Sequence, residues 1–289
     1  MLNIAAVYGD LRQKYLIEAL AQEYVNIKSF GFNDIYNYPN IEICSNYIEA
    51  VDNADVVIAP IPISKDGKTL FTIYEQLPKI YIEEFMKKCK GKIVMAGVLN
   101  EEVLKLAQKN DIKIFDLLKS EENSIYNAIP TAEGAIEIAM KESDITIYNS
   151  NLAVLGFGRC GKALAKALRG LGGNVYVYAR KESDIAYVKM YGYNVLDFKD
   201  LKNMDFIFNT IPSTILEKEK IVTLKRSCII IDIASAPGGC DFKAAADNNI
   251  KALFCPSIPG RVAPKSVAET LKLAVIKILK REEGNLWES

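Results

Sequence analysis

The fold is decided by the stretch Leu152-Ala-Val-Leu-Gly156-Phe-Gly158-Arg-Cys-Gly161-Lys-Ala-Leu-Ala-Lys-Ala-Leu168. An apolar strand enters three glycines with the spacing G-x-G-x-x-G, and a helical pattern with Leu164 and Leu168 on one face leaves them. A second strand, 174–179, follows after a glycine-rich turn. This strand–turn–helix–strand context is what the dinucleotide-binding fingerprint requires. The stretch therefore predicts a Rossmann domain for a nicotinamide dinucleotide.

Each glycine of the fingerprint has a separate physical reason. Gly156 permits the tight turn, Gly158 lets the backbone approach the pyrophosphate, and Gly161 lets the helix pack close to the strand. The free N–H groups at the start of that helix hold the anion. We assign Cys160 to packing rather than to chemistry. Besides the three glycines, the residues of the bend that we place in the cofactor site are Phe157, Arg159 and, as a packing residue, Cys160.

The residues at the end of the second strand are expected to bind the adenosine half of the cofactor. NAD enzymes place an acidic residue there, where it binds the ribose hydroxyls and repels a 2′-phosphate. This sequence has Arg180 at about that place, followed by Lys181 and Ser183. A guanidinium matches a phosphate with paired donors, so these residues favour NADP(H). The alternative is that both cations are simply solvated and that Glu182 or Asp184 binds the ribose.

Three further loops follow predicted strands and should lie against the nicotinamide, at 209–213, 232–239 and 255–265. Ligands of such sheets bind outside the carboxyl ends of the strands. The alternative is that Pro and Gly merely end these strands, but three such loops after a fingerprint favour a site. The residues that we assign to the cofactor from these loops are Asn209, Thr210, Ile211, Pro212 and Ser235.

The chain is predicted to have two α/β domains. Residues 1–129 read as a parallel α/β domain for substrate or partner, with strands at 4–7, 26–30, 55–59, 92–96 and 112–115 and helices at 12–23 and 101–109. Strands that alternate with helical patterns indicate a parallel sheet covered by helices.

An interdomain helix is predicted at 130–150, with Thr131 as its N-cap. The Rossmann domain spans 151–281. For its last helix, 265–281, packing on this domain and packing back on the first domain are both left open. Residues 282–289 read as a frayed polar tail.

Composition excludes several classes of function. Lys plus Arg and Asp plus Glu number 36 each, so no basic excess indicates nucleic acid or a membrane surface as partner. No apolar run approaches the roughly 18 residues of a spanning helix. Six scattered cysteines predict reduced thiols in a cytoplasm and no metal site. There is no histidine, so any chemistry must use carboxylates, Lys, Tyr, Cys, Ser or the cofactor.

Candidate groups for a carboxylate-bearing substrate are the cations Arg12, Arg261 and Lys265. Arg12 follows a predicted strand and would face the cleft if the domains pack edge to edge; a surface salt bridge with Asp10 or Glu18 is the competing interpretation. The candidate proton-transfer groups are Asp10, Glu133, Asp232 and Lys265. Glu133 has a simpler alternative as an acid in the first turn of a helix.

These loops together resemble the A-subunit family of dipicolinate synthases, over nearly the whole chain and in order. The matching segments are 9–13, 125–134, 154–161, 179–180, 209–213, 232–239 and 259–265. The segments 232–239 and 259–265 are much more specific than the fingerprint. The sequence departs from the family pattern at Tyr8, Cys240 and Arg261, and we therefore weight Lys265 and Arg12 above Arg261 as carboxylate ligands.

The resemblance implies an NADP-dependent enzyme that oxidises dihydrodipicolinate, from its hydroxylated tetrahydro precursor, to dipicolinate during sporulation. It also implies that the partner is a flavoprotein-like second subunit, and it adds Asp10 and Thr131 to the substrate site. The two substrate carboxylates need cations, which Arg12 and Lys265 could supply from opposite sides of a cleft. Whether the chain is also a homo-oligomer stays open.

Two alternatives remain. One is another two-domain NADP-dependent dehydrogenase of the shikimate type, which uses a Lys/Asp pair; hydroxyacid dehydrogenases generally use a histidine, which this chain lacks. The other is a regulatory subunit that binds NADPH without catalysis.

Overall fold

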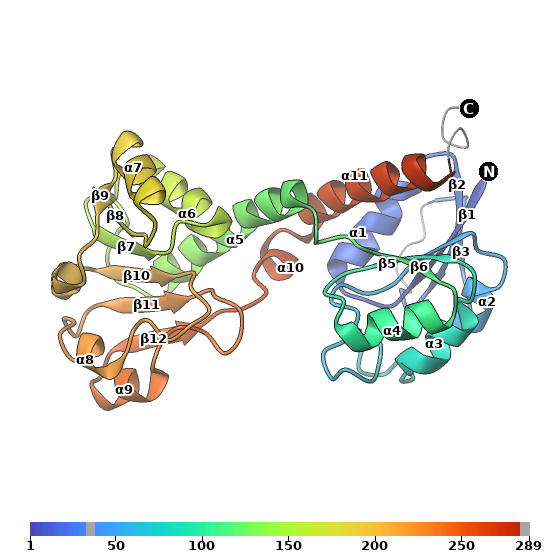
Figure 1. The fold of residues 1–289 in the computed structure, drawn as a ribbon, viewed down its shortest axis with the longest axis horizontal. Helices are drawn as coiled ribbons and strands as arrows, with labels where there is room; N and C mark the ends of the chain where they lie inside the picture. Colours follow the sequence, from blue (N-terminus) through green and yellow to red (C-terminus); the bar gives the residue numbers. More distant parts are fainter. Residues whose placement is uncertain (33–37, 284–289) are drawn as a thin grey trace. The chain divides into compact units, whose positions relative to one another are not determined.

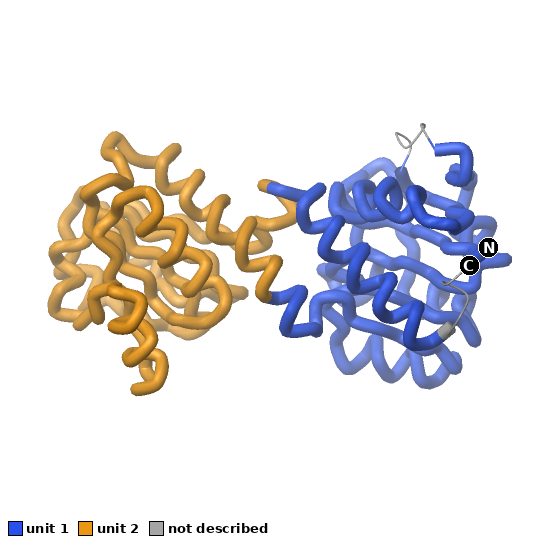
Figure 2. Tube along the Cα trace, turned by 90° about the horizontal axis from the view of Figure 1, so that it is seen from above, with its two compact units in different colours: residues 1–124, 263–289 blue, residues 125–262 orange. Residues whose placement is uncertain are grey.

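The computed structural model describes residues 1–32 and 38–283. The chain divides into two compact units (Figure 2). Unit 1 comprises residues 1–124 and the chain from residue 263 onward, and unit 2 comprises residues 125–262. Each unit is built on one six-stranded sheet, and every pairing within both sheets is parallel. The prediction of two parallel α/β domains is confirmed.

The sheet of unit 1 has the order β3-β2-β1-β4-β5-β6 (Figure 1). Its strands are β1 (Leu2–Val7), β2 (Val25–Phe30), β3 (Ile41–Ile43), β4 (Val56–Ile58), β5 (Ile93–Ala96) and β6 (Lys113–Asp116). Its helices are α1 (Leu11–Leu20), α2 (Tyr47–Val51), α3 (Ile82–Lys88), α4 (Glu101–Lys109) and α11 (Pro264–Glu283). The strand order reverses between β1 and β4, which is where ligands bind in open α/β sheets.

The sheet of unit 2 repeats this order as β12-β11-β10-β7-β8-β9. Its strands are β7 (Asn151–Leu155), β8 (Asn174–Tyr178), β9 (Asn194–Val195), β10 (Phe206–Asn209), β11 (Ile229–Asp232) and β12 (Lys251–Phe254). Its helices are α6 (Arg159–Gly170), α7 (Glu182–Met190), the 3₁₀ helix η1 (Phe198–Asn203), α8 (Lys218–Ile221), α9 (Phe242–Asp247) and α10 (Pro259–Val262). The long helix α5 (Glu121–Lys141) begins in unit 1 and continues in unit 2.

Alternate residues of each strand face opposite layers of the core, as the two-residue period of a strand requires. In β1, Ile4 and Ala6 join one buried cluster whereas Ala5 and Val7 join the other. In β10, Phe206 and Phe208 lie on one side and Ile207 on the other. Both sheets are therefore covered on both faces, which leaves the edges at the strand ends as the places for polar chemistry.

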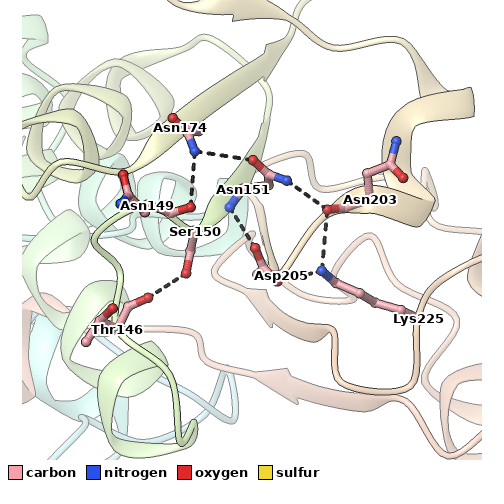
Figure 3. Close-up of polar contacts among 8 residues, drawn as sticks. All are labelled: Thr146, Asn149, Ser150, Asn151, Asn174, Asn203, Asp205 and Lys225. Atoms are coloured by element: carbon pink, nitrogen blue, oxygen red, sulfur yellow. Dashed lines mark hydrogen bonds and ion pairs between the residues drawn. The ribbon is translucent and has the colours of Figure 1, made fainter.

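The amino edge of the sheet in unit 2 is closed by a structural polar network (Figure 3). The backbone N–H of Asn151 donates to Asp205 at 2.7 Å, Lys225 pairs with the same carboxylate at 2.5 Å, and Asn174 donates to the side chain of Asn151 at 3.4 Å. Unit 1 repeats the first of these contacts between Asn3 and Asp55 at 2.9 Å. With its amino edge occupied in this way, unit 2 offers its carboxyl edge to a ligand.

The connecting helix differs from its prediction. Thr131 is not an N-cap, because α5 begins at Glu121 and contains Pro130. A proline within a helix removes one hydrogen bond and costs about 3 kcal/mol. The buried side chains Ala132, Ala135 and Ile136 pack on the core of unit 2, and burial of this face offsets that cost. The Pro-Thr pair misled the sequence analysis because the packing partners lie far away in the chain.

The last helix belongs to unit 1 rather than to the Rossmann unit. Val267, Leu271 and Val275 are buried in one cluster with Leu16 and Leu20 of α1. Lys272 also pairs with Glu23 at 2.6 Å. Each aliphatic side chain buried in this way contributes about 1.5–3 kcal/mol. α11 extends to Glu283, and the rest of the predicted tail lies outside the described residues.

Candidate functional site

The bend after β7 has the geometry that a dinucleotide needs. Gly156 has φ +99°, and a Cβ built on it would lie 2.4 Å from Thr210 Oγ1. A Cβ on Gly161 would lie 2.1 Å from the carbonyl oxygen of Gly156. A Cβ on Gly158 would meet no atom within 4 Å. The first and third glycines therefore serve the packing of the protein itself, whereas Gly158 borders open space.

That open space lies at the start of α6. Gly158 is the N-cap of the helix and has no side chain with which to satisfy the first N–H groups. Such an end binds phosphate through its N–H groups and its dipole. The cradle therefore fits the diphosphate of a dinucleotide.

The other residues of the bend surround this helix end. Phe157 is buried, whereas Arg159 is exposed. Burial raises the pKa of the Cys160 thiol, against smaller lowering effects of Arg159 and of a hydrogen bond with Thr131. The Thr131 hydroxyl donates to the carbonyl of Asn127 at 2.7 Å. A thiol kept protonated by burial serves packing, and Thr131 lies against the fingerprint helix.

The turn after β8 carries the residues predicted for the adenosine end of the cofactor. Gly156 N donates to Tyr178 O at 2.9 Å, which holds the bend against the end of β8. Arg180, Lys181 and Ser183 are exposed. Within residues 1–32 and 38–283, no side-chain hydrogen bond or ion pair engages Arg180, and none engages Glu182 or Asp184. Arg180, Lys181 and Glu182 are thus exposed to a ligand, whereas Asp184 is half-buried.

Four strand ends of unit 2 lie in line at the carboxyl edge. Leu155 of β7 pairs with Asn209 of β10, Asn209 pairs with Asp232 of β11, and Asp232 pairs with Phe254 of β12. Thr210 donates to Leu155 O through its N–H at 3.0 Å and its hydroxyl at 2.8 Å.

Asp232 is the centre of this edge, and its carboxylate is completely buried. One carboxylate oxygen accepts from Asn209 Nδ2 at 2.9 Å and from Ala234 N at 3.1 Å, and the other accepts from Gly239 N at 2.7 Å. A carboxylate with these partners has little capacity left for a substrate proton. The structure therefore favours a role in holding the loops 209–213 and 232–239 together over the predicted role in proton transfer. We call this network the Asp232 clasp.

The exposed parts of these loops are the groups that can meet a ligand. Pro212 and Ser235 are exposed, and Ile211 is half-buried with its N–H donating to Asn209 Oδ1 at 3.1 Å. The clasp thus presents side chains that the sequence assigned to the cofactor, while Asn209 itself is buried and structural.

Glu133 and Arg261 lie on neighbouring segments of unit 2. A Cβ on Gly134 would lie 2.3 Å from Ile258 and 2.6 Å from Val262, so α5 packs tightly on the segment that carries Arg261. Both predicted side chains are exposed. One guanidinium N–H of Arg261 donates to Pro256 O at 3.0 Å.

In unit 1, Asp10 and Arg12 form the ion pair that the sequence left as the alternative, and it is not fully on the surface, because Arg12 is buried and Asp10 is half-buried. Arg12 binds both carboxylate oxygens of Asp10, with the shortest contact at 2.7 Å, and also donates to Ile61 O. Asp10 caps α1 and accepts from the N–H of Arg12 at 2.9 Å. Gln13 completes a capping box. Arg12 therefore ties the loop after β1 to the loop after β4.

Lys265, the remaining predicted substrate ligand, stands in the first turn of α11 and is exposed. It shares unit 1 with Asp10 and Arg12, whereas Glu133, Asp232, Arg261 and Thr131 belong to unit 2. Of the predicted site residues, the structure thus brings Asp10 and Arg12 together in unit 1, and it gathers the residues of the glycine bend at the start of α6 in unit 2. None of the predicted site residues lies in the segment 59–81 after β4, which has no helix or strand.

Comparisons with known proteins agree with this division. Residues 3–118 match the family model for the N-terminal domain of the dipicolinate synthase A-subunit. Residues 126–238 match the model described as D-isomer specific 2-hydroxyacid dehydrogenase, NAD binding domain. The second match identifies unit 2 as a nicotinamide-dinucleotide-binding domain of a dehydrogenase family. No helix in the described part of the chain is long and apolar enough to cross a membrane.

Similar proteins cover the whole length. The dipicolinate synthase A-subunit of Bacillus subtilis (strain 168) is 31% identical over 98% of both chains. The crystal structure of the same protein from Bacillus halodurans aligns with a TM-score of 0.88 at 29% identity, over 96% of this chain and 97% of that one. A transhydrogenase from Sinorhizobium meliloti, at 13% identity and a TM-score of 0.71 over 96% of this chain and 93% of that one, shares the fold alone. The chain belongs to the A-subunit family of dipicolinate synthases.

Proposed function

We propose that the chain is the NADP(H)-dependent subunit of a dipicolinate synthase, and that it oxidises dihydrodipicolinate to pyridine-2,6-dicarboxylate. The family and the dinucleotide domain support the coarse assignment. The observation that carries the proposal is the glycine bend, in which Gly161 packs on Gly156 while Gly158 leaves the end of α6 open.

The preference for NADP(H) is supported by Arg180. Its guanidinium is exposed at the end of β8, where it can bind a 2′-phosphate through paired donors. Lys181 and Ser183 lie beside it and are also exposed. Glu182 and Asp184 are the competing ribose ligands, and their use would indicate NAD(H).

Aromatisation of the ring removes one hydride and one proton from the substrate. NADP⁺, when bound, accepts the hydride. The exposed residues Pro212 and Ser235 on the loops of the Asp232 clasp would lie against the nicotinamide when the cofactor is bound. We assign the departing proton to the exposed carboxylate of Glu133, because the carboxylate of Asp232 already accepts three hydrogen bonds.

The substrate carboxylates need cations, and Lys265 and Arg261 are exposed candidates. Arg12, which the sequence also put forward, is engaged by Asp10 and Ile61. We therefore propose that Lys265 binds a carboxylate, with Arg261 as a secondary candidate, and that Arg12 shapes the loops of unit 1. A second subunit, which the family resemblance describes as flavoprotein-like, completes the enzyme.

The test is a turnover assay with purified chain, dihydrodipicolinate and NADP⁺, with and without the second subunit. NADPH absorbance and the ultraviolet bands of dipicolinate are followed together. Stoichiometric formation of both products by the single chain or by the pair supports the proposal. Binding of NADPH without turnover under either condition contradicts it and indicates the regulatory role.

A further inference from the structure

A row of cations lies along the exposed side of α6. Leu164 and Leu168 of this helix pack in the core of unit 2, whereas Lys162, Lys166 and Arg169 are exposed. The three cations are spaced four and three residues apart, which places them on one stripe of the helix. α6 contains no acidic residue, and no ion pair in the described part of the chain involves any of the three cations. The stripe therefore carries positive charge that the described residues do not neutralise.

Tyrosines of α7 and of the turn after it border this stripe. The Lys162 ammonium lies 5.8 Å from the ring centre of Tyr187. The Arg169 guanidinium lies 5.6 Å from the ring centre of Tyr193, and it donates to the carbonyl of Tyr191. Contacts between cations and rings hold the charged groups in place, so these side chains lose less conformational entropy when they bind a partner.

The same region has an exposed apolar surface. α6 and α7 contribute to one buried cluster, so they cover the same face of the sheet (Figure 1). Tyr187, Met190 and Tyr191 are 47%, 65% and 49% exposed, and the rings of Tyr187 and Tyr191 are stacked at 5.9 Å between their centres. Tyr, Met and Arg are enriched at interfaces between proteins, and Tyr and Arg are frequent hot spots. We call the cation stripe together with these three side chains the α6–α7 face.

The charge of this face decides which partner fits. A second copy related by a two-fold axis would place cations against cations, because such an interface uses the same patch twice. Single-stranded nucleic acid stacks its bases on free aromatic rings, but Tyr187 and Tyr193 already have cations over their rings. A protein surface that carries carboxylates supplies the missing charge and also offers apolar side chains to the tyrosines.

We propose that the α6–α7 face docks an acidic segment of the second subunit, whose carboxylates bind Lys162, Lys166 and Arg169. The choice of partner rests on the proposed function, of which a second subunit is a part. At 1.5 Å of rise per residue, the three cations span about 10 Å of the helix. Carboxylates about one helical turn apart on the partner match this spacing.

The experiment measures binding of the full chain to the purified second subunit by biolayer interferometry, at low and at physiological salt. Affinity should fall as the salt concentration rises, mainly through slower association. The Lys162→Glu/Lys166→Glu double variant should bind about 10–100-fold more weakly, because like charges then face each other. Tyr187→Ala should weaken binding about tenfold through faster dissociation.

The matched control is the Lys202→Glu/Lys243→Glu double variant. Both lysines are exposed residues of unit 2, and η1 and α9, which carry them, pack on the opposite face of the sheet. This variant has the same change of charge and should bind the second subunit as wild type does. The melting temperature and the NADPH affinity should stay at wild-type values in both double variants.

The proposal is overturned if the second subunit does not bind, if the Lys162→Glu/Lys166→Glu variant binds as wild type does, or if both double variants lose equal affinity. It is also overturned if this variant instead dissociates a complex between copies of the chain, or if a single-stranded oligonucleotide binds the face as tightly as the second subunit. The proposed function fails with a different signature, which is binding through this face without formation of NADPH and dipicolinate. Turnover by a pair that the charge reversal leaves intact contradicts the docking face alone.

Discussion

Replacement of Asp232 by asparagine tests the clasp at the carboxyl edge of unit 2. The carboxylate is fully buried and accepts hydrogen bonds from Asn209, Ala234 and Gly239. Asparagine has the same shape, but its NH₂ group must replace one of the two oxygens. Asn209 and Ala234 donate to one oxygen and Gly239 donates to the other. The new amide therefore loses fewer hydrogen bonds when its oxygen faces Asn209 and Ala234 and its NH₂ group faces the N–H of Gly239.

The magnitude follows from that count. Two buried donors, the N–H of Gly239 and the new NH₂ group, are left without an acceptor at a cost of about 1–3 kcal/mol each, and the remaining bonds lose their charge assistance. Relief of the buried charge offsets part of this cost. We therefore expect Asp232→Asn to lower the free energy of unfolding by about 2 kcal/mol, which corresponds to roughly 6–10 °C in the melting temperature of a unit of this size.

Calorimetry and urea unfolding measure the stability, and titration with NADPH measures whether the loops 209–213 and 232–239 still support cofactor affinity. We expect weaker NADPH binding together with the loss of stability. Asp247→Asn is the control, since Asp247 is an exposed carboxylate of the same unit, and its effect should stay within about 0.5 kcal/mol. If Asp232→Asn abolishes turnover while stability and NADPH affinity stay at wild-type values, the clasp interpretation is refuted and Asp232 is a proton-transfer group.

Three further predictions concern other parts of the chain. Gly161→Ala should lower both the melting temperature and NADPH affinity, because its Cβ would lie 2.1 Å from a backbone oxygen. Gly158→Ala should weaken NADPH binding alone, because its Cβ meets no protein atom within 4 Å. Equal melting temperatures for the two variants would contradict this prediction. Lys265→Ala should raise the KM for the dicarboxylate substrate and leave the Kd for NADPH unchanged, and a raised Kd instead would place the residue in the dinucleotide site. Burial raises the pKa of Tyr8 to about 12, so the protonated phenol stabilises unit 1 below pH 10, and this stabilisation is lost as the pH rises from about 10 to 12. Urea unfolding should show that the difference in unfolding free energy between wild type and Tyr8→Phe shrinks over this range. A constant difference would contradict the prediction.

The sequence was sufficient for the features that depend on local chemistry. Gly156 and Gly161 were predicted from spacing alone, because a tight turn and a close helix–strand contact leave no room for a side chain. The positions of Asn209 and Asp232 at the strand ends followed from the apolar runs that precede the loops 209–213 and 232–239. Their neighbouring places in the sheet follow from the parallel topology.

The features that depend on distant packing were not accessible in this way. Pro130 predicted a helix boundary, but its helix is maintained by burial against unit 2. The chain order gave α11 to the second domain with packing back on the first domain left open, and the structure shows that its apolar face does pack on α1. Local propensity carries no information about such partners.

The candidate site shows the same limit for individual residues. Asp232 was selected as an acid after a strand, and only the structure reveals that three donors from its own chain surround it. Arg12 was selected as a cation, and its engagement by Ile61 depends on a loop 49 positions away.

In the proposed function, unit 2 binds NADP(H) with Arg180 on the 2′-phosphate. The most direct measurement is fluorescence titration of wild type and Arg180→Asp with NADPH and with NADH. We expect wild type to bind NADPH at least about tenfold more tightly than NADH. We expect Arg180→Asp to lose about 10–100-fold in NADPH affinity while its NADH affinity hardly changes. Equal losses for both dinucleotides, or a wild-type preference for NADH, would contradict it.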